Sequence, residues 1–302
     1  MTGSEVLSSP IDVAEEWITY QDESLEAMLP LGTTILGIYP HGSSYWCGWT
    51  RTSEIRTEQA DGSELSFFLK VSQNHAGKAM VAQEYVSMKT LYDIVPDLLP
   101  KPIGYGTYAA NPNIHFFISE FVEMTDDVPD TSFMASLADL HSKTSSPNNK
   151  YGFSLPAYQR TVLQYTQWTD SWEEFFTNSL KHVFEIEEKV HGQDKEMKIL
   201  ERAIIQKVVP RLLRPLETGG RSIQPRLIHG DIWDGNCSTR AADNSPVIFD
   251  AICLYGHNEA ELAPLRPARH KMGKAFIKAY FRHFPVSPPE EDQDDRNALY
   301  CL

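Results

Sequence analysis

The stretch LIHGDIWDGN, residues 227–236, and the segment VIFD, residues 247–250, carry the polar groups around which we expect the chain to be organised. An apolar run precedes the polar residues in each case, which predicts a short buried strand that ends in a loop. Together they supply two carboxylates, Asp231 and Asp250, and one carboxamide, Asn236, five residues after Asp231. Each of these residue types is also common in turns, so one alone would indicate little. Three in this order indicate a functional site.

This order of groups is the one that phosphoryl transfer requires. One aspartate accepts the proton of the acceptor hydroxyl, an asparagine five residues later holds Mg²⁺, and a second aspartate at a strand end holds metal against the phosphates. We therefore predict Asp231 as the catalytic base, Asn236 and Asp250 as magnesium ligands, and ATP as the phosphoryl donor. Because this reaction needs little covalent help from the protein, positioning and charge neutralisation are what the sequence must encode.

A lysine inside an apolar strand supplies the next part of the predicted site. Residues 65–71, LSFFLKV, predict a buried strand, in which the Lys70 ammonium is costly unless it meets an anion. The following segment has helical periodicity, and Glu84 lies on the edge of its apolar stripe. The stripe consists of Val81, Tyr85, Met88 and Tyr92. We predict a Lys70–Glu84 ion pair that places the lysine against the α- and β-phosphates of the nucleotide.

Two weaker patterns complete the predicted nucleotide site. Residues 34–39 and 45–55 predict strands joined by a hairpin tip that contains Gly42, Ser43 and Ser44. Small residues there let backbone N–H groups approach a phosphate, so we predict a phosphate lid, although an ordinary polar hairpin would look the same. Residues 114–119 then predict a buried strand that runs into a polar loop, where the backbone of Glu120 and Val122 is expected to pair with adenine.

The remainder of the chain after this loop is predicted to be mainly helical. Apolar stripes indicate helices over 169–190 and 197–213, with Val183 and Val208 facing the core, and a further helix over 273–284. A basic stretch occurs at residues 266–274, and the acidic segment 289–295 is expected to be solvated or disordered.

Composition limits the kinds of partner that the protein could have. The chain has 302 residues, 41% of them hydrophobic, and 41 acidic against 27 basic residues give a net charge of −14. A diffuse acidic surface repels nucleic acid and anionic membranes, and we identify no basic patch that would overcome this repulsion. Four widely spaced cysteines form no C-x-x-C, and neither a signal peptide nor an apolar membrane span is visible, which predicts a cytoplasmic protein.

Taken together, these residues resemble the fructosamine kinase (ketosamine-3-kinase) family within the aminoglycoside and choline phosphotransferase group. The motifs that carry the resemblance are FLKV at 68–71, ADLH at 138–141, YGF at 151–153, HGDIWDGN at 229–236, PVIFD at 246–250 and YGHNEAEL at 255–262. The sequence departs from the family pattern at Ala251, where proline is common.

The resemblance implies an α+β, two-lobed, protein-kinase-like fold. Residues 1–119 would form a nucleotide-binding lobe with an antiparallel sheet and one key helix, residues 120–302 a mainly helical catalytic lobe, and residues 120–124 the hinge. It also implies a kinase that phosphorylates a sugar hydroxyl of ketosamines on amines or protein lysines, as a monomer or weak dimer, with Trp233, His257 and Glu261 towards the sugar.

Two alternatives stay open on the sequence alone. The acceptor could instead be another amino sugar, an aminoglycoside or a choline-like alcohol, since a cationic amine is common to all of these and suits an acidic surface. The protein could also be a catalytically inactive nucleotide-binding homologue, although such proteins usually lose one of the four polar residues Lys70, Asp231, Asn236 and Asp250.

Overall fold

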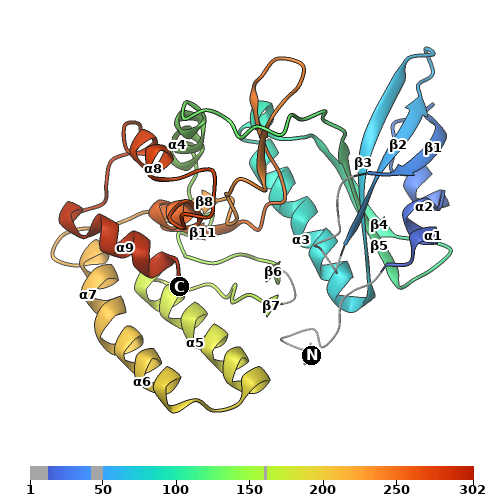
Figure 1. Cartoon of the computed structure of the whole chain (residues 1–302). Helices are drawn as coiled ribbons and strands as arrows, with labels where there is room; N and C mark the ends of the chain where they lie inside the picture. Colours follow the sequence, from blue (N-terminus) through green and yellow to red (C-terminus); the bar gives the residue numbers. More distant parts are fainter. Residues whose placement is uncertain (1–12, 42–49, 160–161) are drawn as a thin grey trace. The chain divides into compact units, whose positions relative to one another are not determined.

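The computed structural model describes residues 13–41, 50–159 and 162–302, which form two compact units (Figure 1). Unit 1 comprises Met1–Thr125, Ala157–Leu163 and Arg240–Asp250, and unit 2 comprises Asp126–Pro156, Gln164–Thr239 and Ala251–Leu302. The sequence predicted a single boundary between residues 119 and 120. In the structure the first change of unit follows Thr125, so the predicted hinge 120–124 lies in unit 1, and the chain later returns to unit 1 twice.

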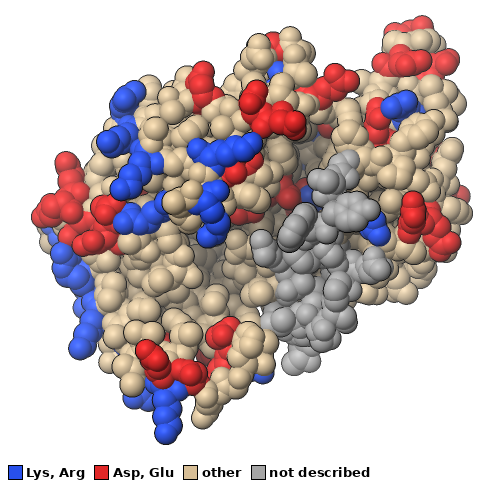
Figure 2. Space-filling model, in the orientation of Figure 1, with Lys and Arg blue, Asp and Glu red and all other residues tan. Residues whose placement is uncertain are grey.

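The molecular surface carries both signs of charge. Figure 2 shows acidic and basic side chains in separate groups on one face, and one group of Lys and Arg side chains lies where Figure 1 draws α8 of unit 2. The expectation of a diffuse acidic surface without a basic patch is therefore wrong for the described residues, because the net charge of −14 is not spread as a uniform acidic coat.

Unit 1 is built on an antiparallel sheet with strand order β1-β2-β3-β5-β4. Its elements are α1 (Glu15–Ile18), α2 (Glu23–Glu26), β1 (Thr34–Pro40), β2 (Arg51–Glu58), β3 (Glu64–Gln73), α3 (Asn74–Tyr92), η2 (Pro96–Leu98), β4 (Pro102–Thr107), β5 (Ile114–Glu120), β6 (Tyr158–Gln159), β7 (Val162–Leu163) and β10 (Pro246–Ile248). The strands predicted at 34–39, 65–71 and 114–119 and the helix that carries Glu84 are all present.

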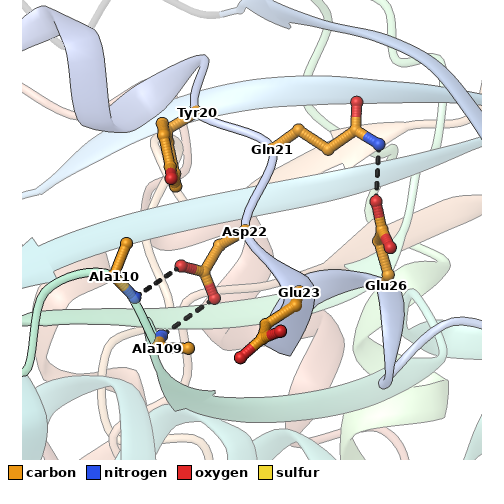
Figure 3. Close-up of a pocket in the computed structure, with 7 residues that line it drawn as sticks. All are labelled: Tyr20, Gln21, Asp22, Glu23, Glu26, Ala109 and Ala110. Carbon is orange, nitrogen blue, oxygen red and sulfur yellow. Dashed lines mark hydrogen bonds between the residues drawn. The ribbon is translucent and has the colours of Figure 1, made fainter.

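The N-terminal helices of unit 1 are attached to the chain that follows β4 through Asp22. Its carboxylate accepts the N–H groups of Ala109 and Ala110 at 2.9 and 3.0 Å and caps α2 through the Ser24 N–H at 2.9 Å (Figure 3). Burial acts to raise the pKa of Asp22, but these N–H groups outweigh it and hold the pKa below its ordinary value. A hollow of about 420 Å³ lies beside Asp22. We assign it no function, because the Asp22 carboxylate is already used by the fold.

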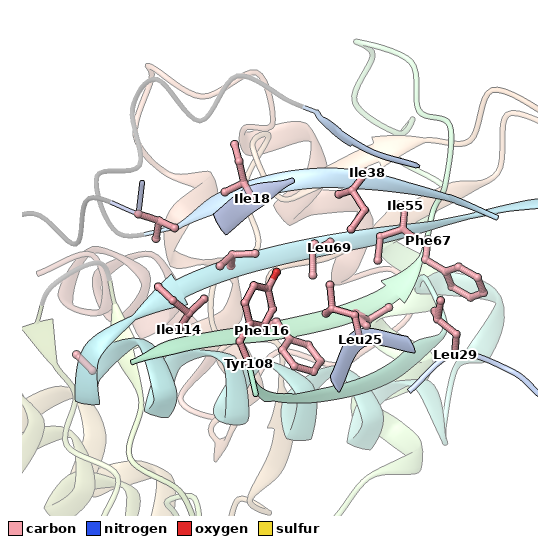
Figure 4. Packing of buried hydrophobic residues seen from close by; sticks show 14 of the residues in the cluster. Ile18, Leu25, Leu29, Ile38, Ile55, Phe67, Leu69, Tyr108, Ile114 and Phe116 are labelled. Atoms are coloured by element: carbon pink, nitrogen blue, oxygen red, sulfur yellow. The ribbon is translucent and has the colours of Figure 1, made fainter. Parts of the chain in front are cut away.

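One hydrophobic cluster of unit 1 lies on the face of the sheet that Figure 4 shows. The buried residues shown and labelled there are Ile18, Leu25, Leu29, Ile38, Ile55, Phe67, Leu69, Tyr108, Ile114 and Phe116. Side chains alternate along a strand, so Leu69 and Val71 of β3 face this core and Lys70 between them faces the opposite side. Helix α3 lies along that opposite side, which is why the lysine meets a residue of α3.

Unit 2 is mainly helical, with one short two-stranded pairing of β8 and β11. Its elements are α4 (Phe133–Lys143), α5 (Trp172–His191), α6 (Lys195–Ala203), η3 (Ile204–Val208), α7 (Val209–Leu213), η4 (Arg214–Glu217), β8 (Arg226–Ile228), β9 (Cys237–Thr239), β11 (Leu254–Gly256), η5 (Asn258–Leu265), α8 (Lys274–Tyr280), η6 (Glu290–Asp292) and α9 (Gln293–Tyr300). Its core packs Trp172 and Phe175 of α5 against Val209, Leu212 and Leu213 of α7.

Three sequence expectations for unit 2 are wrong. Val183 on α5 and Val208 on η3 are 43% and 38% exposed, so neither side chain faces the core. The segment 289–295 is not disordered, because it forms η6 and the start of α9. Arg296 anchors it: the guanidinium is fully buried and donates to Glu259 at 2.9 and 3.0 Å.

Among the described residues, none of the helices combines the length and apolar character that crossing a bilayer demands.

Candidate active site

Unit 1 brings Lys70, Glu84 and Asp250 together. The Lys70 Nζ atom donates to Glu84 Oε1 at 2.7 Å and to Asp250 Oδ1 at 2.5 Å. The side chains of Lys70 and Glu84 are 9% and 11% exposed, whereas that of Asp250 is 50% exposed. The predicted ion pair is therefore present, and it has a third member that the sequence placed in the site but not beside the lysine.

Burial and the charges of these three residues together shift the pKa values of Lys70 and Glu84. Burial acts to lower the pKa of Lys70, but the carboxylates of Asp250 and Glu84 outweigh it and hold the pKa above its ordinary value. Burial raises the pKa of Glu84 to about 7; the Asp250 carboxylate acts in the same direction and Lys70 opposes both. With two carboxylates and one ammonium, the group is short of positive charge.

Asp250 also has an unusual backbone conformation. It follows β10 at φ 63°, in the left-handed region, which aspartate tolerates better than most residues. The turn ends the strand with the side chain beside Lys70, while half of the carboxylate's surface remains accessible. Asp250 can therefore bind a further cation without leaving the lysine.

The remaining predicted nucleotide contacts are described only in part. Gly42, Ser43 and Ser44 lie outside the described residues. Glu120 ends β5, its N–H donates to the Lys101 carbonyl at 2.8 Å, and its carboxylate accepts the Lys101 N–H at 3.1 Å. Val122 is half-buried just beyond this strand. A contact from Glu120 to adenine would therefore use its carbonyl oxygen, because its N–H is engaged.

Unit 2 brings Asp231 and Asn236 together on the loop after β8. Asn236 Nδ2 donates to the backbone oxygen of Asp231 at 2.9 Å and to its carboxylate Oδ2 at 2.8 Å. The Asn236 N–H closes the loop by donating to the Trp233 carbonyl at 2.9 Å. Asn236 is buried and Asp231 is partly exposed, so the asparagine holds the aspartate at the surface of the unit.

Glu261 holds the backbone of the loop that carries Asp231 and Asn236. Its carboxylate accepts the N–H of His229 at 2.5 Å and that of Gly230 at 3.0 Å, and its side chain is fully buried. His141 Nε2 lies 3.5 Å from the same carboxylate. The Ile252 N–H donates to the His229 carbonyl at 2.9 Å, which ties the loop to the chain just before β11. Glu261 therefore positions the loop that carries Asp231.

The expectation that His257 and Glu261 lie towards a sugar conflicts with their burial. Both ring nitrogens of His257 are engaged, with Tyr300 at 2.8 Å and Ser287 at 2.9 Å, and the residue is 0% exposed. Burial lowers the pKa of His257 to about 4, so the imidazole is neutral at physiological pH. Since the polar atoms of both residues are used inside unit 2, we assign them a structural role.

Trp233 is the one predicted sugar contact that is partly exposed. Its ring lies 5.3 Å from that of His270, edge to face, and the next residue, Asp234, meets His270 Nδ1 through Oδ1 at 2.8 Å. His270 could not be linked to this loop from the sequence, because no periodic pattern joins residues so far apart.

The predicted metal ligands have the oxygen chemistry that Mg²⁺ prefers. Both bonds from the Asn236 carboxamide use Nδ2, so Oδ1 is the atom suited to bind a metal. Asp250 offers a half-exposed carboxylate in a group that lacks positive charge. The residues of each unit therefore fit the metal that the sequence implies.

Comparison with known proteins identifies the family. The family model described as Fructosamine kinase matches residues 51–302. The chain belongs to the fructosamine kinase family. A chloroplastic protein-ribulosamine 3-kinase of Oryza sativa subsp. indica is 31% identical over 241 residues, which are 78% of this chain and 65% of the rice protein. The match thus spans slightly less than two thirds of that relative.

Solved structures confirm the predicted kinase-like α+β fold of this family member. A Thermobifida fusca structure, titled provisionally as a fructosamine-3-kinase, has a TM-score of 0.66 at 20% identity and covers 90% of this chain and 89% of its own. An aminoglycoside phosphotransferase in complex with AMP-PNP and hygromycin B has a TM-score of 0.54 at 16% identity, with 89% and 84% covered. At these identities the likeness concerns the fold.

Proposed function

We propose that the protein is an ATP-dependent ketosamine kinase, which phosphorylates a sugar hydroxyl of ketosamines such as fructosamine or ribulosamine on amines or protein lysines. Such a reaction would serve the repair of glycated proteins. The observation that carries the proposal is the Asp231–Asn236 pair, held by Glu261 on a loop inside the family-matching segment. The names of the relatives, protein-ribulosamine 3-kinase among them, supply the acceptor class.

In the proposed reaction the acceptor hydroxyl oxygen forms a bond to the γ-phosphorus as the bond from that phosphorus to the bridging oxygen of ADP breaks. Asp231 orients the hydroxyl and takes its proton late in the step. Lys70 neutralises phosphate charge, and Glu84 keeps the ammonium in place. When bound through Asn236 Oδ1 and Asp250, Mg²⁺ would neutralise charge that develops on the phosphates. The proposal requires the groups of both units to act on one nucleotide.

The variant Asp231→Asn tests the role of the base. We expect kcat with a fructosamine acceptor to fall about 10³-fold, the middle of the range for a lost general base, while the fold is retained. Coupled ADP release measures turnover, and circular dichroism with thermal unfolding measures the fold. Asp139→Asn, an exposed aspartate of the same unit that pairs with Lys143, is the matched control and should keep full turnover. Wild-type turnover in Asp231→Asn would refute the assignment.

A panel of acceptors distinguishes the alternatives left open by the sequence. Fructosamines and ribulosamines should be used well, and aminoglycosides and choline poorly, when each is supplied with ATP and Mg²⁺. Mg²⁺-dependent ATP binding without turnover of any acceptor would favour the inactive homologue. The presence of Lys70, Asp231, Asn236 and Asp250 supports the active enzyme.

The cytoplasmic setting stays a prediction; the rice relative is named as chloroplastic.

A further inference from the structure

A run of positive charge in unit 2 contrasts with the acidic character of the whole chain. Residues 266–283 contain six Lys and Arg residues and no Asp or Glu, in a protein with a net charge of −14. We call the exposed members of this run the basic surface. They are Arg269, Lys271, Lys274, Lys278 and Arg282. The blue side chains near α8 in Figure 2 show this concentration of charge.

Most of the basic surface takes no part in holding the fold together. Arg266, at the start of the run, pairs with Asp294 at 2.7 Å, and Lys271 donates to the Asp126 carbonyl at 3.3 Å. Within the part of the chain that the structure describes, the other four exposed cations make no ion pair within 4.0 Å. The charge of Lys274 still helps Arg266 to lower the pKa of Asp294, and the rest of this positive charge is available to a partner.

The placement of Lys274 and Lys278 costs stability. Both lie on α8, four residues apart, where like charges repel by a few tenths of a kcal/mol. Lys274 also occupies the first turn of the helix, where a cation opposes the helix dipole. Positive charge that no ion pair of the fold uses is better explained by the recognition of an anion than by packing.

The basic surface is attached to the catalytic loop. His270, which lies between Arg269 and Lys271, contacts Asp234 Oδ1 at 2.8 Å and the ring of Trp233 at a centroid distance of 5.3 Å. A ligand on the basic surface would therefore be bound in the same unit as Asp231 and next to the loop that carries it. This position suits recognition of the molecule that carries the acceptor sugar.

We propose that the basic surface binds an acidic segment of the protein that bears the ketosamine, an inference that rests on the proposed function. The backbone positions of Lys274 and Lys278 are about 6 Å apart along the helix axis. Alternate side chains of an extended peptide are about 7 Å apart, so two aspartates on one side of such a peptide match the two lysines. The enzyme would thus prefer glycated lysines flanked by Asp or Glu to the same sugar on a neutral segment.

The test compares three acceptors in coupled ADP assays at low salt. They are a peptide with a central fructosamine-lysine flanked by aspartates, the same peptide with serine flanks, and free fructosyl-lysine. We expect wild type to favour the aspartate peptide about five- to tenfold in kcat/KM through KM, as two partly screened ion pairs would. In Lys274→Gln/Lys278→Gln this preference should disappear, while kcat/KM for free fructosyl-lysine stays unchanged.

A matched control removes two exposed lysines from other helical segments of unit 2. In Lys181→Gln/Lys207→Gln, with changes in α5 and η3, the preference should be as in wild type. An equal kcat/KM for both peptides in wild type, or a preference that survives in Lys274→Gln/Lys278→Gln, would overturn the inference and leave the proposed kinase function intact.

Binding measurements separate the inference from the proposed function. If no acceptor is turned over, the proposed function fails, and fluorescence anisotropy with the labelled aspartate peptide then decides the inference: salt-sensitive binding that is lost in Lys274→Gln/Lys278→Gln supports it, and its absence refutes it. A DNA duplex or phosphatidylserine vesicles that bind more tightly than the peptide and depend on the same lysines would also overturn it, because the surface would then serve another class of partner.

Discussion

In unit 1 two carboxylates share one ammonium, whereas in unit 2 each buried glutamate has its own set of donors. Glu259 accepts from the Arg296 guanidinium at 2.9 and 3.0 Å, and Glu261 accepts two backbone N–H groups. The unit 1 group is short of positive charge and half of Asp250 is exposed, while the unit 2 glutamates are enclosed. This difference suggests that the first group is completed by a ligand and that the second set serves rigidity.

The largest loss of stability should come from breaking the buried ion pair between Arg296 and Glu259 in unit 2. Arg296→Met leaves Glu259 buried without its cation, which typically costs about 3–5 kcal/mol in the free energy of unfolding. Urea unfolding measures the loss. Arg214→Met is the control, because the Arg214–Glu173 pair has a 59% exposed arginine side chain and should contribute at most about 1 kcal/mol. Similar losses in the two variants would remove the distinction between enclosed and open pairs.

The group of Lys70, Glu84 and Asp250 in unit 1 should instead stabilise the protein when a ligand binds to it. A non-hydrolysable ATP analogue with Mg²⁺ at a hundred times its Kd should raise the free energy of unfolding of the wild type by about 2.7 kcal/mol. In Asp250→Asn most of this gain should be lost, since the proposed metal ligand is weakened, while Asp139→Asn should keep it. Thermal unfolding with and without a chelator measures both. An unchanged gain in Asp250→Asn would argue that the exposed carboxylate has no part in binding.

Glu84 of unit 1 and Glu261 of unit 2 should also differ in how replacement by glutamine changes the stability of the protein. Because the pKa of Glu84 is raised to about 7, its protonation favours the folded state; this contribution is fully present below the unfolded pKa of 4.5 and is lost as the pH rises through about 7. Glu84→Gln mimics the protonated form. It should therefore be close to wild type in stability near pH 5 and more stable than wild type near pH 8.

Glu261→Gln should behave in the opposite way. An amide offers one acceptor oxygen to the two N–H groups of His229 and Gly230, so one donor is left unsatisfied at a cost of about 1–3 kcal/mol. We expect the variant to be less stable than wild type at pH 8, where Glu84→Gln is more stable. Urea unfolding of both variants at the two pH values measures this, and a stability change of the same sign in both variants at pH 8 would contradict the proposed difference between Glu84 and Glu261.

Local pattern was enough to predict the pair Lys70–Glu84. Strand alternation sets the face on which Lys70 lies, helical periodicity sets the face of Glu84, and the strand leads directly into the helix. Asp231 and Asn236 were expected to share a site because they lie five residues apart in one motif, but the hydrogen bond between them was not predicted. Motif resemblance supplied the rest of the predicted fold.

Contacts between distant parts of the chain were not predictable from local pattern. The acidic segment 289–295 resembles a solvated tail because its structure depends on Arg296 reaching Glu259, a residue with no sequence relation to it. His257 and Glu261 are polar and belong to a motif, so they suggested a binding role. Their burial depends on partners such as Tyr300 and His229. For the segment 289–295, the sequence feature that could have indicated an ion pair is Arg296, which directly follows the acidic residues.

The conformation of Gly230 limits how this loop can change. Its φ of 86° is in the region that only glycine adopts easily, and a Cβ atom there would overlap the Ile252 carbonyl oxygen. The protein-kinase motif H-R-D has an arginine at the equivalent step. Replacing Gly230 by arginine would therefore force the chain at Ile252 to move, so the two forms of the loop cannot be exchanged by a single substitution.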